Sequence, residues 1–217
     1  MQKIKYLLLI PILIPLGYGF GKEFIHEVIL INYFNIIRAG FYLPFLISLR
    51  TSCFFLAQAS YFSILKHELI HNLFALLTFN KPHGLVVNRG GGGEFSYSGD
   101  GNILIALSPY FFPLLSFCWV PISLLHIGNI SIYISILGIL FGLDVSTSVK
   151  DMHFEQTDFK PYGLLVPALF ISMSIFIFWG SIIAFSQNGF HGIEKYFIGG
   201  VSNVISGVSK IAKYMSG

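Results

Sequence analysis

His67 and His71 lie four residues apart in the sequence His67-Glu68-Leu69-Ile70-His71. On an α-helix, residues at this spacing lie on one face, one turn apart, so their imidazoles can bind the same metal ion. Glu68 is rotated by about 100° around the helix and can reach a water molecule on that metal. The pattern predicts a catalytic Zn²⁺ site in which His67 and His71 bind the ion. Glu68 is the general base that takes a proton from the water.

The predicted site lies in an apolar stretch, residues 54–79, in which Lys66 adds a further charge. The alternative interpretation is a polar contact between helices or a fraying helix end. Ionisable side chains within a membrane are energetically costly and are mostly retained for function. We therefore favour a metal site over a structural polar cluster.

The composition of the chain is that of a membrane protein. Hydrophobic residues make up 54% of its 217 residues, charged residues make up 11%, and the mean hydropathy is +0.74. Soluble domains carry about 25% charged residues, so this chain has too few to cover a water-facing surface. The net charge of +3 includes no basic block suited to a phosphate backbone. We therefore expect no nucleic-acid partner and a lipid bilayer as the surroundings.

We expect an all-α membrane protein, a bundle of four to six transmembrane helices with a short β-hairpin insertion. A hydrocarbon core of ~30 Å is crossed by about 20 helical residues. Apolar runs near that length define the expected crossings, which are 4–20, 54–79, 103–125, 127–149 and 164–185. Residues 24–49 are interpreted either as an interfacial helix with a re-entrant piece or as one imperfect crossing. We prefer an uncleaved first span over a cleaved signal peptide for residues 1–20.

Two further segments are not expected to cross the membrane. The glycine-rich residues 80–101 are predicted to form a hairpin of two short strands, 84–88 and 94–98. Residues 189–217 place apolar side chains at helical spacing. This second pattern predicts an amphipathic helix that lies on the membrane surface.

The sequence resembles the site-2-protease class of intramembrane zinc metalloproteases, most of all its small bacterial members. The resemblance rests on HELIH at residues 67–71, the glycine-rich hairpin, and Ser-Pro-Tyr at residues 108–110. The chain is taken as one integral membrane domain, 1–217, with a metalloprotease-like core at 54–186. The resemblance implies that two histidines and a downstream aspartate bind zinc and that the glutamate is the base. It also implies a membrane-bound protein substrate whose helix unwinds in a pocket within the membrane.

The third zinc ligand is where the chain departs from the family pattern, because no Asp-Gly pair follows the hairpin. The candidates are Asp144, Asp151 and Asp158. Asp144 lies near the end of the span 127–149, at a depth that agrees with HELIH within about 5 Å. Asp158 precedes a helix, and its distance from HELIH along the chain suits the larger family members. Both remain candidates, the alternatives being a hydrogen bond to a neighbouring helix and a helix N-cap, whereas Asp151 is expected to be a solvated charge at a helix end.

The expected function is that of an intramembrane zinc metalloendopeptidase that hydrolyses peptide bonds of membrane-bound protein substrates. The resemblance places such a protein in a bacterial inner membrane as a multi-pass protein. The strand at 94–98 is expected either to hold a substrate by strand addition or to be part of a simple surface hairpin. One rival function is a catalytically inactive relative acting as a scaffold or chaperone, which the missing Asp-Gly pair favours. A metal transporter is disfavoured, because no second His or Asp cluster occurs on a facing span.

Overall fold

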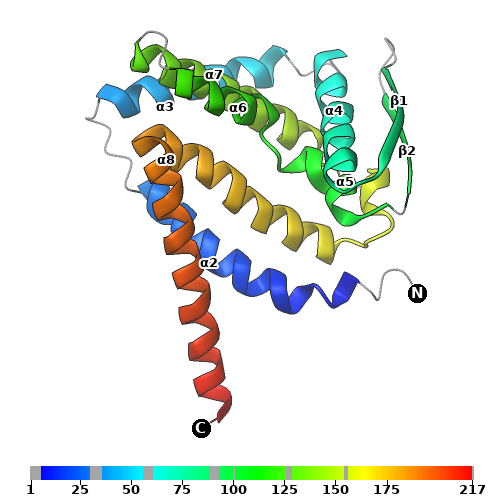
Figure 1. Ribbon diagram of the computed structural model, residues 1–217, viewed down its shortest axis with the longest axis vertical. Coiled ribbons are helices and arrows are strands. Elements are labelled where there is room, and N and C mark those ends of the chain that lie inside the picture. The colour runs from blue at the N-terminus through cyan, green and yellow to red at the C-terminus, as the bar shows by residue number, and fades with distance from the viewer. Residues whose placement is uncertain are drawn as a thin grey trace.

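The computed structural model describes residues 6–29, 36–55, 61–87, 93–99, 101–125, 129–153 and 156–216. Within these ranges the chain is mostly helical and carries one antiparallel hairpin (Figure 1). The α-helices are α2 (Ile10–Ile29), α3 (Ile36–Phe55), α4 (Tyr61–Leu77), α5 (Ile103–Leu107), α6 (Leu114–Trp119), α7 (Ile130–Asp151) and α8 (Leu165–Ser216). Three 3₁₀ turns, η1 (Ser108–Tyr110), η2 (Val120–Leu125) and η3 (Thr157–Phe159), and two strands, β1 (Lys81–Val87) and β2 (Gly93–Ser98), complete the fold.

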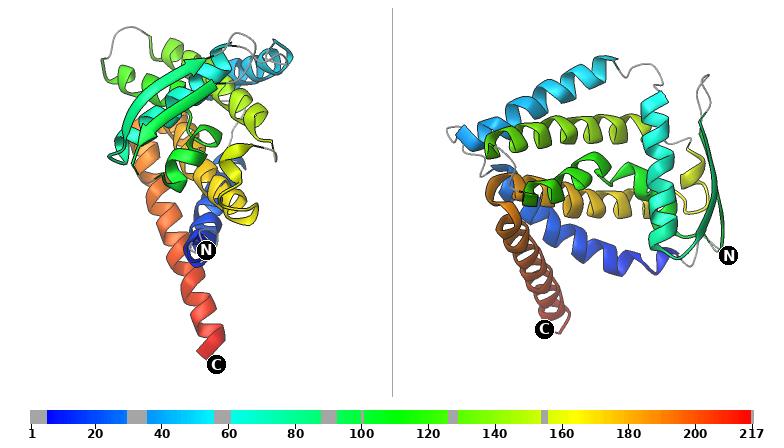
Figure 2. Two further views of the ribbon diagram at one scale, coloured as in Figure 1. Left: turned by 90° about the vertical axis from the view of Figure 1, so that its right-hand side faces the viewer. Right: turned by 45° about the horizontal axis from the view of Figure 1, so that its top comes forward.

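Helices α2, α3, α7 and the first half of α8 lie alongside one another and form a bundle (Figures 1 and 2). Within it, α2 packs along α8 and α3 packs along α7. Glycines permit close approach: a side chain at Gly138 would meet the carbonyl of Phe41, and one at Gly19 would meet the backbone of Gly200 in the second part of α8. Small residues at helix contacts are typical of proteins whose helices pack within lipid.

Helices α7 and α8 confirm the apolar helices predicted at 127–149 and 164–185, and each is long and apolar enough to cross a membrane. The crossing predicted at 103–125 is instead broken into Ile103–Tyr110 and Leu114–Ile122, which are bent by 90°. Proline has no backbone N–H to continue a helix, and prolines occur at the break, at positions 109 and 113. Two described helices therefore have membrane length, or three if the bent pair counts as one span.

The two N-terminal helices differ from the predicted segments in their limits. The first predicted span, 4–20, corresponds to α2, which continues to Ile29. The segment 24–49, for which two interpretations were open, is divided between the end of α2 and the start of α3. Residues 30–35 lie outside the described ranges. Neither helix meets the criteria of length and apolarity for a crossing among the described residues.

Helix α8 is broken into two parts by Asn188 and Gly189, whose backbone is not helical. Gly189 has φ 61°, in the left-handed region that glycine adopts without steric cost. The second part, which begins at residue 190, turns away from the bundle (Figure 1). It confirms the helix predicted at 189–217, and large apolar side chains such as Ile198 and Ile205 are exposed on it. Its contact with a membrane surface stays a prediction.

The crossing predicted at 54–79 stays a prediction. Its first two residues end α3, residues 56–60 lie outside the described ranges, and α4 comprises only 17 residues, Tyr61–Leu77. Helix α4 is not among the described helices that are long and apolar enough to cross a membrane. It lies across one end of the bundle instead of alongside the other helices (Figures 1 and 2).

The predicted hairpin is confirmed, with β1 and β2 paired in antiparallel register from Lys81 opposite Ser98 to Val87 opposite Gly93. Residues 88–92, which include most of the predicted connection, lie outside the described ranges. The hairpin lies beside α4 (Figure 2), and the ring of Phe95 stacks on that of His71 with centroids 5.9 Å apart. Because side chains alternate along a strand, Gly93, Phe95 and Tyr97 share the face that meets α4.

Candidate metal centre

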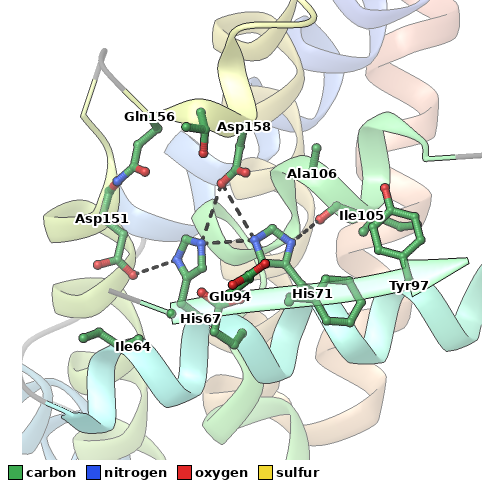
Figure 3. Close-up of a pocket in the computed structure, with 14 residues that line it drawn as sticks. Ile64, His67, His71, Glu94, Tyr97, Ile105, Ala106, Asp151, Gln156 and Asp158 are labelled. Atoms are coloured by element: carbon green, nitrogen blue, oxygen red, sulfur yellow. Dashed lines mark hydrogen bonds and ion pairs between the residues drawn. The ribbon is translucent and has the colours of Figure 1, made fainter. Parts of the chain in front are cut away.

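The two motif histidines face each other across one turn of α4, as their spacing predicted. The Nε2 atoms of His67 and His71 are 3.1 Å apart, and the two side chains are only 13% and 9% exposed. Figure 3 shows both rings directed into one pocket. Their inner nitrogens are therefore close enough to share one ion.

Asp158 completes a group of three at this point. It lies in η3, in the connection between α7 and α8, and its Oδ2 is 3.7 Å from the Nε2 atom of each histidine. The three ligand atoms all lie within 4.8 Å of one another. Of the two aspartates that the sequence left open, the structure brings Asp158 to the histidines.

Each of the three groups has a partner on its outer side. Asp151 Oδ2 lies 3.1 Å from His67 Nδ1, and the carbonyl oxygen of Ile105 lies 2.7 Å from His71 Nδ1 (Figure 3). The hydroxyl of Tyr110 donates to Asp158 Oδ2 at 2.7 Å. Carbonyl and carboxylate oxygens only accept hydrogen bonds, so each Nδ1 carries a hydrogen, and a neutral imidazole then has its lone pair on Nε2.

The arrangement fits a metal ion. Two Nε2 atoms and a carboxylate oxygen converge, and with both imidazoles neutral these three atoms can all bind one cation. Two ligands about 2.1 Å from a tetrahedral zinc ion lie roughly 3.4 Å apart, close to the observed separations of 3.1 and 3.7 Å. Two imidazoles and one carboxylate leave a fourth position open, as in catalytic zinc sites, and outer hydrogen bonds of this kind orient zinc ligands.

The carboxyl of Asp158 is ionised readily despite its partial burial. Burial acts to raise its pKa, but interactions with His67, His71 and the Tyr110 hydroxyl outweigh burial and hold the pKa below the usual value. A carboxylate is the form that binds a metal ion. Asp158 therefore has the charge that a third ligand requires.

Glu68 lies beside the group of three and does not belong to it. Its side chain lines a pocket of about 470 Å³ together with His67, His71 and Asp158. Strand β2 closes over it: a Cβ atom at Gly93 would lie 2.5 Å from Glu68 Oε1. Glu68 therefore lines the same pocket as the three residues, and its role as the base stays a prediction.

Asp144 lies elsewhere, in a buried ion pair. Its Oδ1 is 3.1 Å from Lys66 Nζ, and its Oδ2 accepts hydrogen bonds from the backbone N–H and the hydroxyl of Ser116. Leu115 N–H donates to Oδ1 as well. Asp144 therefore links α4, α6 and α7, and its oxygens point to these donors. Asp144 thus reaches α4 at Lys66, which is the contact with a neighbouring helix that was the alternative to a ligand role.

Asp151 has a role that the sequence did not predict. It was expected to be a solvated helix-end charge, whereas its carboxylate contacts His67 and is within 3.5 Å of the Ser63 hydroxyl. A signal was present: Asp144 and Asp151 are seven residues apart, so they lie on the same side of α7 about two turns from each other. The spacing therefore places both aspartates on the side of α7 that contacts α4.

None of the protein families, curated proteins or solved structures compared with the chain matches it. The resemblance to site-2 proteases therefore depends on the motif residues alone.

Proposed function

We propose that this chain is a zinc endopeptidase that acts on membrane-bound protein substrates. The observation that carries the proposal is the convergence of two imidazole Nε2 atoms and the Asp158 carboxylate, with an acceptor oxygen next to each Nδ1 atom on the outer side. His67, His71 and Asp158 are the proposed zinc ligands. Membrane attachment is supported by the apolar length of α7 and α8.

The residues around the ligands have separate roles in this proposal. Zinc, when bound, supplies Lewis acidity and makes a water molecule nucleophilic near neutral pH. Glu68 accepts the proton that the water loses and delivers it to the leaving amine. Asp151, Ile105 and Tyr110 hold the three ligands in orientation, which keeps the open side of the site directed into the pocket.

The free edge of strand β2 is a further reason to propose a peptide as the substrate. The sheet has only two strands within the described residues, so β2 has an edge without a neighbouring strand. Gly93, Glu94, Phe95 and Tyr97 of this strand line the same pocket as Glu68. A peptide that pairs with such an edge is held extended by backbone hydrogen bonds, which is the form in which a peptide bond is accessible to a water nucleophile.

Replacing Glu68 by Gln tests the proposal. The amide keeps the size of the side chain but cannot take a proton, so we expect turnover to fall by at least about 10²-fold while zinc stays bound. Cleavage of a set of single-span test proteins by the zinc-loaded protein in lipid nanodiscs, read by mass spectrometry, measures the activity. Metal analysis of the same samples measures the zinc. Undiminished cleavage by the variant, or no cleavage by the unsubstituted chain, would contradict the proposal.

A further inference from the structure

Helix α4, which carries His67 and His71, lies across one end of the bundle (Figures 1 and 2). We propose, on the basis of the peptidase function above, that the site lies at the membrane–water boundary. It takes the polar segment of a substrate that adjoins its membrane anchor, and not a helix unwound within the hydrocarbon. Three independent features of the described residues carry this inference.

The first feature is the position of α4 relative to the bundle. Helices α2, α3, α7 and the first half of α8 run side by side, whereas α4 lies across the end at which α7 finishes and α8 begins (Figures 1 and 2). The hairpin lies on the outer side of α4, away from the bundle (Figure 2, right). If α7 and α8 cross the membrane, α4 and the hairpin lie along its surface.

The second feature is the place of the ligands along the apolar helices. Asp151 is the last residue of α7, and Asp158 lies between α7 and the start of α8 at Leu165. A hydrocarbon core of ~30 Å takes about 20 helical residues. Counted from Leu165, that length ends shortly before the break at Asn188, so α8 spans the core without including Asp158.

The third feature is the distribution of charge. No charged residue occurs between Ile130 and Leu143 of α7 or between Leu165 and Phe185 of α8. Charged residues follow at the site end, where exposed Lys160 lies two residues from Asp158. Charged side chains are costly in hydrocarbon and are tolerated at its boundary. The uncharged length of α8 is long enough to cross the hydrocarbon and therefore marks the membrane interior, and Asp158 lies before it.

The pocket itself has the lining that a polar peptide requires. One side is formed by β2 and another by Gln156, Thr157 and Asp158, with Glu94 and Thr157 exposed. These two sides offer backbone edges and polar side chains to an entering chain. A segment that leaves the membrane in extended form can enter between them without carrying unpaired backbone groups through lipid.

Cysteine labelling tests the location. In a variant without native cysteines, Thr157→Cys introduces a thiol beside Asp158, and Ile139→Cys introduces one at another exposed position, in the middle of α7. The protein is placed in nanodiscs, which leave both membrane faces open, and treated with a charged, membrane-impermeant maleimide. We expect the thiol at position 157 to be labelled at the rate seen in detergent and the thiol at position 139 to be labelled at least about tenfold more slowly. Equal protection of both positions in nanodiscs would overturn the proposed location.

Cleavage-site mapping tests the substrate class with the same preparation. We expect the single-span test proteins to be cut in the polar segment next to the membrane anchor. Cuts only within the apolar segments would overturn the inference and leave the peptidase function intact. If the protein cuts none of the test proteins, both the peptidase function and the preference for the polar segment are overturned. The cysteine labelling reports the location of the pocket independently of activity.

Discussion

Asp151, Ile105 and Tyr110 do not reach the proposed metal position, but they determine which atoms do. By accepting from both Nδ1 groups and donating to Asp158, they leave two imidazole lone pairs and a carboxylate oxygen directed inward. Outer hydrogen bonds of this kind are worth about 10- to 100-fold in metal affinity. The metal affinity of the site therefore depends on residues outside the HELIH motif.

Replacing Asp151 by Asn should weaken zinc binding by about 10- to 100-fold, because the amide is a poorer acceptor for His67 and also removes a charge. Competition with a chelator measures the affinity. Glu94→Gln is the matched control, since Glu94 lines the same pocket and has no hydrogen bond to either histidine among the described residues. A loss of equal size in both variants would show that general charge, and not the hydrogen bond, is responsible.

Asp144→Asn should affect stability and not the metal. The variant leaves the Lys66 charge, 2% exposed, without its partner, and breaking a buried pair costs about 3–5 kcal/mol. Chemical unfolding measures this loss, and the double variant Lys66→Met/Asp144→Asn should recover part of it. Zinc bound per folded chain should be unchanged. Zinc loss without a loss of stability would instead make Asp144 a ligand.

The sequence alone predicts some of the residues of this site and not others. The spacing of His67 and His71 fixes their shared helix face, so these residues and Glu68 were predictable. A count of residues along α7 predicts that Asp144 lies near HELIH, and Asp144 does contact α4, at Lys66. It does not predict which side of α7 faces the histidines, nor how the connection after α7 folds back, and both were needed to choose Asp158.

At the scale of elements, β2 packs against Glu68 at Gly93, where the absence of a side chain leaves room for the carboxylate. A Cβ atom at Gly93 would lie 2.5 Å from Glu68 Oε1 and 2.8 Å from Ile64 Cγ2. Gly93→Ala should therefore displace the Glu68 carboxylate and lower kcat by about tenfold or more, while zinc stays bound because the histidines are not touched. Steady-state kinetics and metal analysis measure the two quantities.

Gly84→Ala is the control for that prediction, because it lies in the same hairpin and its Cβ would meet Ser96 Oγ at an ordinary 3.6 Å. We expect it to keep the kcat of the unsubstituted chain. If both substitutions lower kcat equally, the effect comes from the hairpin as a whole and not from crowding of Glu68.

Most elements followed from local patterns, and the direction of α4 did not. Alternating and glycine-rich segments predicted the hairpin, and uninterrupted apolar runs predicted α7 and α8. The apolar run 54–79 contains no glycine or proline, so the end of α3 and the start of α4 looked like one helix. How a helix packs against the rest is set by contacts between distant residues, such as Lys66 with Asp144, which periodicity does not report.

The whole molecule combines an apolar bundle with a polar site at one of its ends. The proposed ligands come from α4 and from the connection between α7 and α8, so a bound ion joins parts of the chain that are far apart in sequence. An ion that binds only the folded chain stabilises it by about 2.7 kcal/mol at 100 times its dissociation constant. Metal binding and the integrity of this end of the bundle are therefore expected to depend on each other.

Calorimetric titration of the metal-free chain with zinc tests the central claim most directly, with Asp158→Asn as the comparison. We predict one zinc ion per chain for the unsubstituted protein. For the variant we predict an affinity lower by at least about 100-fold, because an uncharged amide replaces an anionic ligand. No binding by the unsubstituted chain, or equal affinity in the two proteins, would contradict a centre formed by His67, His71 and Asp158.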